Sequence, residues 1–159
     1  MSSEPDGTLR RPVELSAPTG SVLVEQPFSR SALYLLRATV AAHAACVGLR
    51  PQQAYDVVVA AHELAANAVL HGAGHGQLRL WTDQTFLYCQ VRDDGPARPG
   101  DQQPAGAPAW PRERGHGLWL IDIIADQFSI DHGPAGTTAT AAFALPQPAG
   151  PAQPGAGNR

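Results

Sequence analysis

Apolar side chains recur along this chain with two different periods. Between Pro51 and Gly72 they return at steps of three and four residues, which predicts an amphipathic helix that begins at a proline and ends at a glycine. A second helix is predicted from Ser29, a candidate N-cap, to Val47, and a more apolar third helix over residues 117–125. The apolar stripe of the helix between Pro51 and Gly72 consists of Ala54, Val58, Ala61, Ala65 and Ala68.

Five further segments have the composition of β-strands, rich in β-branched and aromatic residues and bounded by turn residues. Asp83-Gln84 predicts a hairpin turn, and Gly133 to Gly136 predicts the turn before the last strand. Three helices and five strands in this order predict an α+β fold, a two-layer sandwich in which a mixed, mostly antiparallel sheet packs on the helices. The predicted strands cover residues 21–28, 77–82, 86–92, 127–131 and 137–145.

The composition divides the chain into a folded part and two tails. Residues 1–20 are poor in large apolar side chains, and residues 146–159 are a Pro/Gly/Ala tail, so we expect both to be disordered. The folded domain is then 21–145. Within it, residues 96–114 hold five prolines and little periodicity, which is typical of a functional or disordered loop.

Charge and composition exclude several classes of function. The net charge of −3 argues against a general nucleic-acid binder, and the absence of lysine excludes a lysine-based phosphate loop and a Schiff base. No apolar run reaches the roughly 18 residues that cross a bilayer, and the N-terminus has no signal-peptide core, so we expect a cytoplasmic protein without membrane contact. Cys46 and Cys89 are far apart, and we expect two buried thiols in a reducing compartment.

The segment from Glu63 to Gly72, ELAANAVLHG, carries the first candidate for chemistry. Glu63 and Asn67 lie four residues apart and therefore share one helix face, one turn from each other. Their oxygens are ligands that magnesium prefers. The alternative is a solvated polar stripe on a half-exposed helix.

Two metal interpretations of the same region are less favourable. His62-Glu63 begins like a zinc-protease motif, but Ala66 stands where the second histidine would be required. We interpret His62, His71 and His75 as helix-end or loop residues rather than a metal cluster.

Three later segments contain glycine at informative positions. Asp93-Asp94-Gly95 ends a strand, and a carboxylate fixed there can accept a hydrogen bond from the amine of a base; an ordinary turn is the alternative. Gly115-His116-Gly117-Leu118 opens an apolar helix, and the backbone of its glycines can approach a phosphate closely. The alternative is a turn that only begins the helix. Gly136-Thr137-Thr138 opens the last strand. A threonine hydroxyl there can hydrogen-bond the aspartate or a water next to a base. The alternative is that these are ordinary β-branched residues of a strand.

The order of these four motifs is more informative than any one of them. In that order the chain resembles the Bergerat-fold, histidine kinase-like ATPase superfamily of gyrases, heat-shock chaperones and histidine kinases. Within it, the chain looks like the short anti-sigma factor serine/threonine kinases. The resemblance covers about residues 21–145 and implies ATP and Mg²⁺ as cofactors.

The resemblance also implies a role for each matching residue. Glu63 would be the catalytic base, Asn67 would hold the magnesium, and residues 96–114 would form the ATP lid. Arg112 or Arg114 would meet phosphate charge. Thr137 is the less favoured alternative to Thr138. The nucleotide-binding residues would be Asn67, Asp93, Gly95, Gly115, His116, Gly117, Leu118 and Thr138.

For function, the resemblance implies an anti-sigma factor that phosphorylates a serine or threonine of an anti-sigma antagonist of the STAS type. It would sequester a sigma factor and act as a homodimer, with no nucleic acid or membrane among its partners. The alternative is a non-catalytic regulator that binds nucleotide and changes partners with ATP or ADP occupancy.

Overall fold

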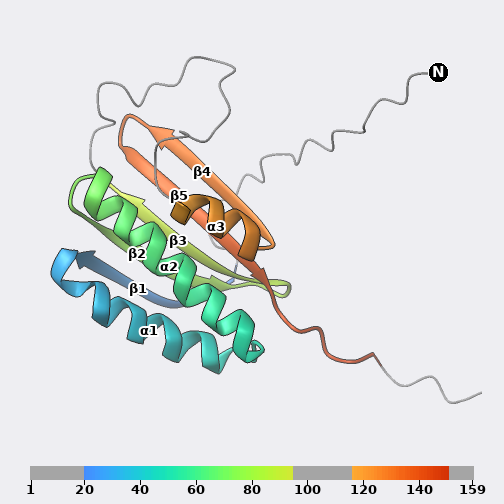
Figure 1. Cartoon of the computed structure of the whole chain (residues 1–159). Helices are drawn as coiled ribbons and strands as arrows, with labels where there is room; N and C mark the ends of the chain where they lie inside the picture. The colour runs from blue at the N-terminus through green and yellow to red at the C-terminus, as the bar shows by residue number, and fades with distance from the viewer. Residues whose placement is uncertain (1–19, 95–115, 151–159) are drawn as a thin grey trace, which may run out of the picture.

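Five strands form one sheet in the computed structural model, which describes residues 20–94 and 116–150 (Figure 1). The strand order across the sheet is β1-β2-β3-β5-β4, and each of these pairings is antiparallel. The strands are β1 (Ser21–Ser29), β2 (His75–Thr82), β3 (Phe86–Asp93), β4 (Gln127–Gly133) and β5 (Gly136–Ala144).

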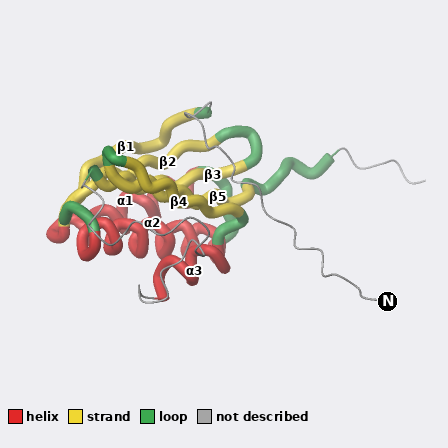
Figure 2. The backbone as a smooth tube through the Cα atoms, turned by 90° about the horizontal axis from the view of Figure 1, so that it is seen from above, coloured by secondary structure: helices red, strands yellow, loops and turns green. Residues whose placement is uncertain are grey.

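Three α-helices lie on one face of this sheet, so the described residues form two layers (Figure 2). A short 3-10 helix, η1 (Arg30–Ala32), precedes the first of them. The two-layer α+β prediction is confirmed, and each predicted helix and strand is present with small shifts of its ends. The helices are α1 (Leu33–Cys46), α2 (Pro51–His71) and α3 (His116–Ile124).

The long helix α2 packs against the sheet and lies between α1 and α3 (Figure 1). Pro51 occupies its first turn as predicted, and Gln53 Nε2 donates to the carbonyl of Ala144, which attaches the helix to the end of β5. The predicted stripe faces the core, since Ala61, Ala65 and Ala68 are buried and the half-buried Ala54 and Val58 pack against the same core. Since α2 has a neighbour on each side as well as the sheet, its buried face is wider: Val57, Ala60, Ala61, Leu64, Ala65 and Ala68.

Along β2 to β5, alternate residues point into the core between the two layers. On β3 these are Leu87, Cys89 and Val91, as the period of two requires. Burial raises the pKa of the Cys89 thiol to about 12. The largest fully buried side chains are Phe143, Leu36, Leu78, Leu80, Leu87, Ile121, Val40, Val57 and Cys89.

Two expectations about α1 are wrong. Cys46 is exposed, not buried, because it lies on the outer side of α1 at its last turn. Ser29 does not cap α1: it precedes η1 instead, and its hydroxyl contacts the hydroxyl of Ser31 at 3.2 Å rather than a backbone N–H. No helix of the described residues has the length and apolar character needed to cross a membrane.

The outer face of the sheet carries a second, smaller cluster at the β2–β3 hairpin. Trp81 and Tyr88 stack with ring centroids 4.9 Å apart, and the Tyr88 hydroxyl donates to Oδ2 of Asp83 at 2.8 Å. Asp83 Oδ1 also accepts the N–H groups of Thr85 and Phe86, each at 2.7 Å. Burial opposes charge on Asp83, but these hydrogen bonds outweigh it and lower the pKa of this carboxyl.

The same contact gives the protein a measurable sensitivity to alkali. Burial, with the hydrogen bond to Asp83 and its negative charge, raises the pKa of Tyr88 from 10.0 to about 12. Between these two values the folded state keeps the phenolic proton while the unfolded state loses it. The contribution of Tyr88 to the free energy of unfolding is therefore complete below pH 10 and decreases as the pH rises toward 12.

We expect Tyr88→Phe to lower stability by about 1 kcal/mol at neutral pH, because one hydrogen bond is lost. We also expect its unfolding free energy to fall less steeply than that of the wild type at alkaline pH. Urea unfolding at a series of pH values measures both effects. Tyr34→Phe is the matched control because that side chain is exposed. Identical slopes in the wild type and Tyr88→Phe would contradict this account.

Candidate functional site

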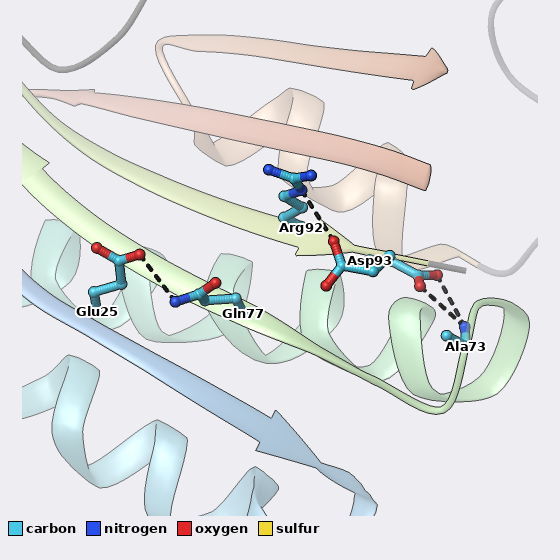
Figure 3. Close-up of polar contacts among 6 residues, drawn as sticks. Glu25, Ala73, Gln77, Arg92 and Asp93 are labelled. Carbon is cyan, nitrogen blue, oxygen red and sulfur yellow. Dashed lines mark hydrogen bonds and ion pairs between the residues drawn. The ribbon is translucent and has the colours of Figure 1, made fainter. Parts of the chain in front are cut away.

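Asp93 is a buried carboxylate at the last position of β3. Its side chain is only 7% exposed and points toward the turn that connects α2 to β2 (Figure 3). There, both carboxylate oxygens accept the backbone N–H of Ala73, each at 3.1 Å. Since a buried carboxylate is stable only when it is hydrogen-bonded, this turn fixes where the charge lies. The contact joins the end of β3 to the end of α2.

The start of β5 approaches Asp93 from the other side. Gly136 has φ of +126°, a conformation that favours glycine, and a Cβ at this position would overlap the carbonyl oxygen of Asp93. The glycine of the fourth motif therefore lets β5 pack against the backbone of the second. The structure thus brings these two motifs together.

The strand register corrects the choice between the two threonines. In the antiparallel pairing of β3 with β5, Thr137 lies opposite Asp93, whereas Thr138 lies opposite Arg92. Directly opposed residues share a face of the sheet, so Thr137 faces the helices with Asp93 and Thr138 faces outward. Arg92, on that outer side, pairs with Asp94 at 3.1 Å. Thr137, not Thr138, is thus the hydroxyl on the side of the aspartate.

Thr137 has a further neighbour on the same side of the sheet. His132 of β4 is its register partner, and His132 Nδ1 and Thr137 Oγ1 are 3.1 Å apart. Asp93, Thr137 and His132 thus form one cross-strand row over β3, β5 and β4. The sequence singled out only the first two of these residues.

Glu63 and Asn67 lie half-buried in the C-terminal half of α2. Glu63 meets the first turn of α3, because a Cβ added at Gly117 would overlap its Oε2. The next residue, Leu118, packs against the core and fixes that turn. The first and third motifs are therefore in contact, with a carboxylate beside the glycine backbone at a helix N-terminus.

The donor set of Glu63 and Asn67 suits magnesium, a hard cation that takes one or two protein oxygens and keeps waters or phosphate oxygens for its other positions. Among residues 20–94 and 116–150, no three His, Cys, Asp or Glu side chains lie together in a way that could hold a metal ion. His62, His71 and His75 therefore do not form a cluster in this part of the chain.

Part of the predicted site falls outside the described residues. This applies to Gly95, Gly115 and the expected lid at 96–114 with Arg112 and Arg114. His116 begins α3, but only its backbone is described.

Sequence reasoning missed the backbone of the α2–β2 turn, residues 72–74. Its Ala73 N–H holds Asp93, and no side-chain pattern predicts a backbone donor. The only signal was the spacing of glycines in Gly72-Ala73-Gly74, directly after the last helical residue, His71. Gly72 had been interpreted only as the stop of the helix.

Comparison with known proteins agrees with this fold. A family model described as a histidine kinase-like ATPase domain matches residues 27–143. The fold is similar to the crystal structure of the RsbU and RsbW domains of Rv1364c from Mycobacterium tuberculosis, with a TM-score of 0.55 and 19% identity. That match covers 77% of this chain but 32% of the other, and at this identity it is a likeness of fold. No curated protein matches the chain.

The contact between Glu63 and Gly117 can be tested by a double-mutant cycle. Alanine is favoured over glycine in a helix by about 0.5–1 kcal/mol, so Gly117→Ala should stabilise a chain that already carries Glu63→Ala. In the wild-type background we expect this gain to be reduced, because the new methyl group must displace the carboxylate. Unfolding free energies of the four proteins measure the difference. Equal effects in both backgrounds would show that the two residues are not in contact.

Proposed function

The chain belongs to the histidine kinase-like ATPase family, and from this premise we propose that it binds ATP with magnesium along the C-terminal half of α2. The observation that supports the proposal is that one helix connects the two places where the ends of such a ligand would lie. The turn that follows it is bonded to the buried carboxylate of Asp93 through the Ala73 N–H, and its C-terminal half carries Glu63 against Gly117. From Glu63 to Gly72 the helix rises by about 13–14 Å, a distance of the order that a nucleoside triphosphate spans.

At the Asp93 end, the ligand is a purine with an exocyclic amine. A carboxylate oxygen accepts hydrogen bonds, and the Ala73 N–H fixes the orientation of both oxygens of Asp93. It is therefore suited to an amine donor. Thr137, on the same face, is the hydroxyl that would hold a water or a ring nitrogen next to it. Gly95 would form the turn beside the base.

At the Glu63 end, the phosphates lie against the start of α3. A helix N-terminus presents unpaired N–H groups, and the glycine at position 117 lets an anion approach them closely. Gly115, His116 and Leu118 border the same region. Magnesium, when bound, supplies positive charge that neutralises the phosphate oxygens. Asn67 would hold it through the side-chain oxygen.

Glu63 is the proposed general base. It lies one turn before Asn67 on the same face, and its carboxylate reaches the turn where the terminal phosphate would be placed. In that position it can take the proton of a serine or threonine hydroxyl as the hydroxyl attacks phosphorus. This assigns the chain a protein serine/threonine kinase activity.

The proposed substrate is an anti-sigma antagonist of the STAS type, and the proposed regulated partner is a sigma factor, bound by a homodimer. Support comes from the motif order and from the likeness of the fold to a structure that contains an RsbW domain. A cytoplasmic location, with no nucleic acid or membrane as partner, follows from this role. A regulator that binds nucleotide without transferring phosphate is the competing function, and a transfer assay separates the two.

Incubation with labelled ATP, magnesium and an antagonist protein should yield phosphoserine or phosphothreonine on the antagonist. We expect Glu63→Ala and Glu63→Gln to reduce transfer by at least about 100-fold, because the general base is lost, and to leave nucleotide affinity nearly unchanged. Transfer that survives both substitutions would remove Glu63 from its role. Nucleotide binding by the wild type without any transfer would favour the non-catalytic regulator.

Asn67→Ala should weaken ATP binding only when magnesium is present. Calorimetry measures the affinity for ATP with excess magnesium and again with a chelator, and the chelator measurement is the control. We expect the variant and the wild type to bind ATP equally in the chelator, and the wild type alone to gain affinity from magnesium. A variant that keeps the full magnesium effect would show that Asn67 is not a ligand.

A further inference from the structure

The two glycines of the α2–β2 turn are glycine for different reasons. Gly74 has φ of +86°, and a Cβ at this position would meet no atom within 4 Å, so only its backbone conformation favours glycine. Gly72 has φ of −103°, which any residue adopts. A Cβ at Gly72, however, would overlap Oδ2 of Asp93 and lie 2.6 Å from the carbonyl oxygen of Ala68. Gly72 is therefore required by close packing against the aspartate.

The next residue supplies the hydrogen bond that this close packing permits. The N–H of Ala73 is 3.1 Å from both oxygens of Asp93 and so approaches the carboxylate on its bisector. A carboxylate held in this way has a fixed orientation. A methyl group at position 72 would push the carboxylate away from Ala73, because the backbone of Asp93 is held by Gly136 on the other side.

We propose that Gly72 is a positioning residue that sets purine selectivity, by allowing the Ala73 N–H to hold Asp93 in the orientation that accepts a 6-amino group. This inference rests on the proposed nucleotide binding and deepens it. A 6-oxopurine presents an acceptor where adenine presents a donor, so a fixed carboxylate repels it. A carboxylate that is free to turn discriminates less between the two.

The test compares ATP with inosine triphosphate, which has an oxygen in place of the 6-amino group. Dissociation constants for both are measured in excess magnesium, on the wild type and on Gly72→Ala. We expect the wild type to prefer ATP by at least about tenfold, the effect of one hydrogen bond to a charged group. In Gly72→Ala, the affinity for ATP should fall and that for inosine triphosphate should change little. The ratio of the two dissociation constants should therefore approach one.

Gly74→Ala is the matched control, because it strains the same turn without adding an atom near Asp93. It should lower the thermal stability of the protein and keep the wild-type preference for ATP. A loss of preference in Gly74→Ala equal to that in Gly72→Ala would mean that any disturbance of the turn suffices, and it would overturn the specific role of Gly72.

Other results separate this inference from the proposed function. A wild-type chain that binds neither nucleotide would overturn both. A Gly72→Ala protein that keeps the wild-type preference would overturn the inference alone. If Gly72→Ala does not fold, the Ala73 amide resonance of the wild type gives the answer: it should shift more with ATP than with inosine triphosphate, and equal shifts would overturn the inference.

Discussion

The hydrogen bonds between Asp93 and the Ala73 N–H are the constraint on which the site depends. A carboxylate removed from water is unfavourable by several kcal/mol unless it is paired or hydrogen-bonded, so the end of β3 and the end of α2 are held together. Because α2 is one continuous helix, this single attachment also sets the position of Glu63 and Asn67 relative to Asp93. The proposed base-binding and phosphate-binding ends are thereby held by one continuous helix.

Small side chains allow this arrangement. The buried face of α2 contains four alanines, which let the helix lie close to the sheet and to both neighbouring helices. Glycines also allow close contacts at the candidate site. Gly72 packs against the carboxylate of Asp93, Gly136 against the backbone of Asp93, and Gly117 against the carboxylate of Glu63. Larger residues at these places would separate elements that must be in contact for the two carboxylates to face one ligand.

The fold was largely predictable from the sequence, because the period of 3.6 on α2 and the runs of β-branched and aromatic residues on the strands are local signals. The side of the sheet that each threonine faces was not predictable. A shift of one residue in register exchanges the two faces, and nothing in Gly136-Thr137-Thr138 specifies the register. The exposure of Cys46 was not predictable either. Because α1 is rich in alanine on its exposed as well as its buried side, the sequence pattern does not show which side faces the core. The backbone donor of Ala73 has no signal in the side-chain pattern.

The central claim, that one adenine nucleotide lies along α2 from Asp93 to Glu63, is tested most directly by NMR titration of the chain with ATP and magnesium. The account predicts that the backbone amides of Ala73 and Gly117 and the side-chain amide of Asn67 shift together, at one saturating stoichiometry. Shifts confined to another surface, or shifts at Ala73 without any at Asn67 and Gly117, would contradict it.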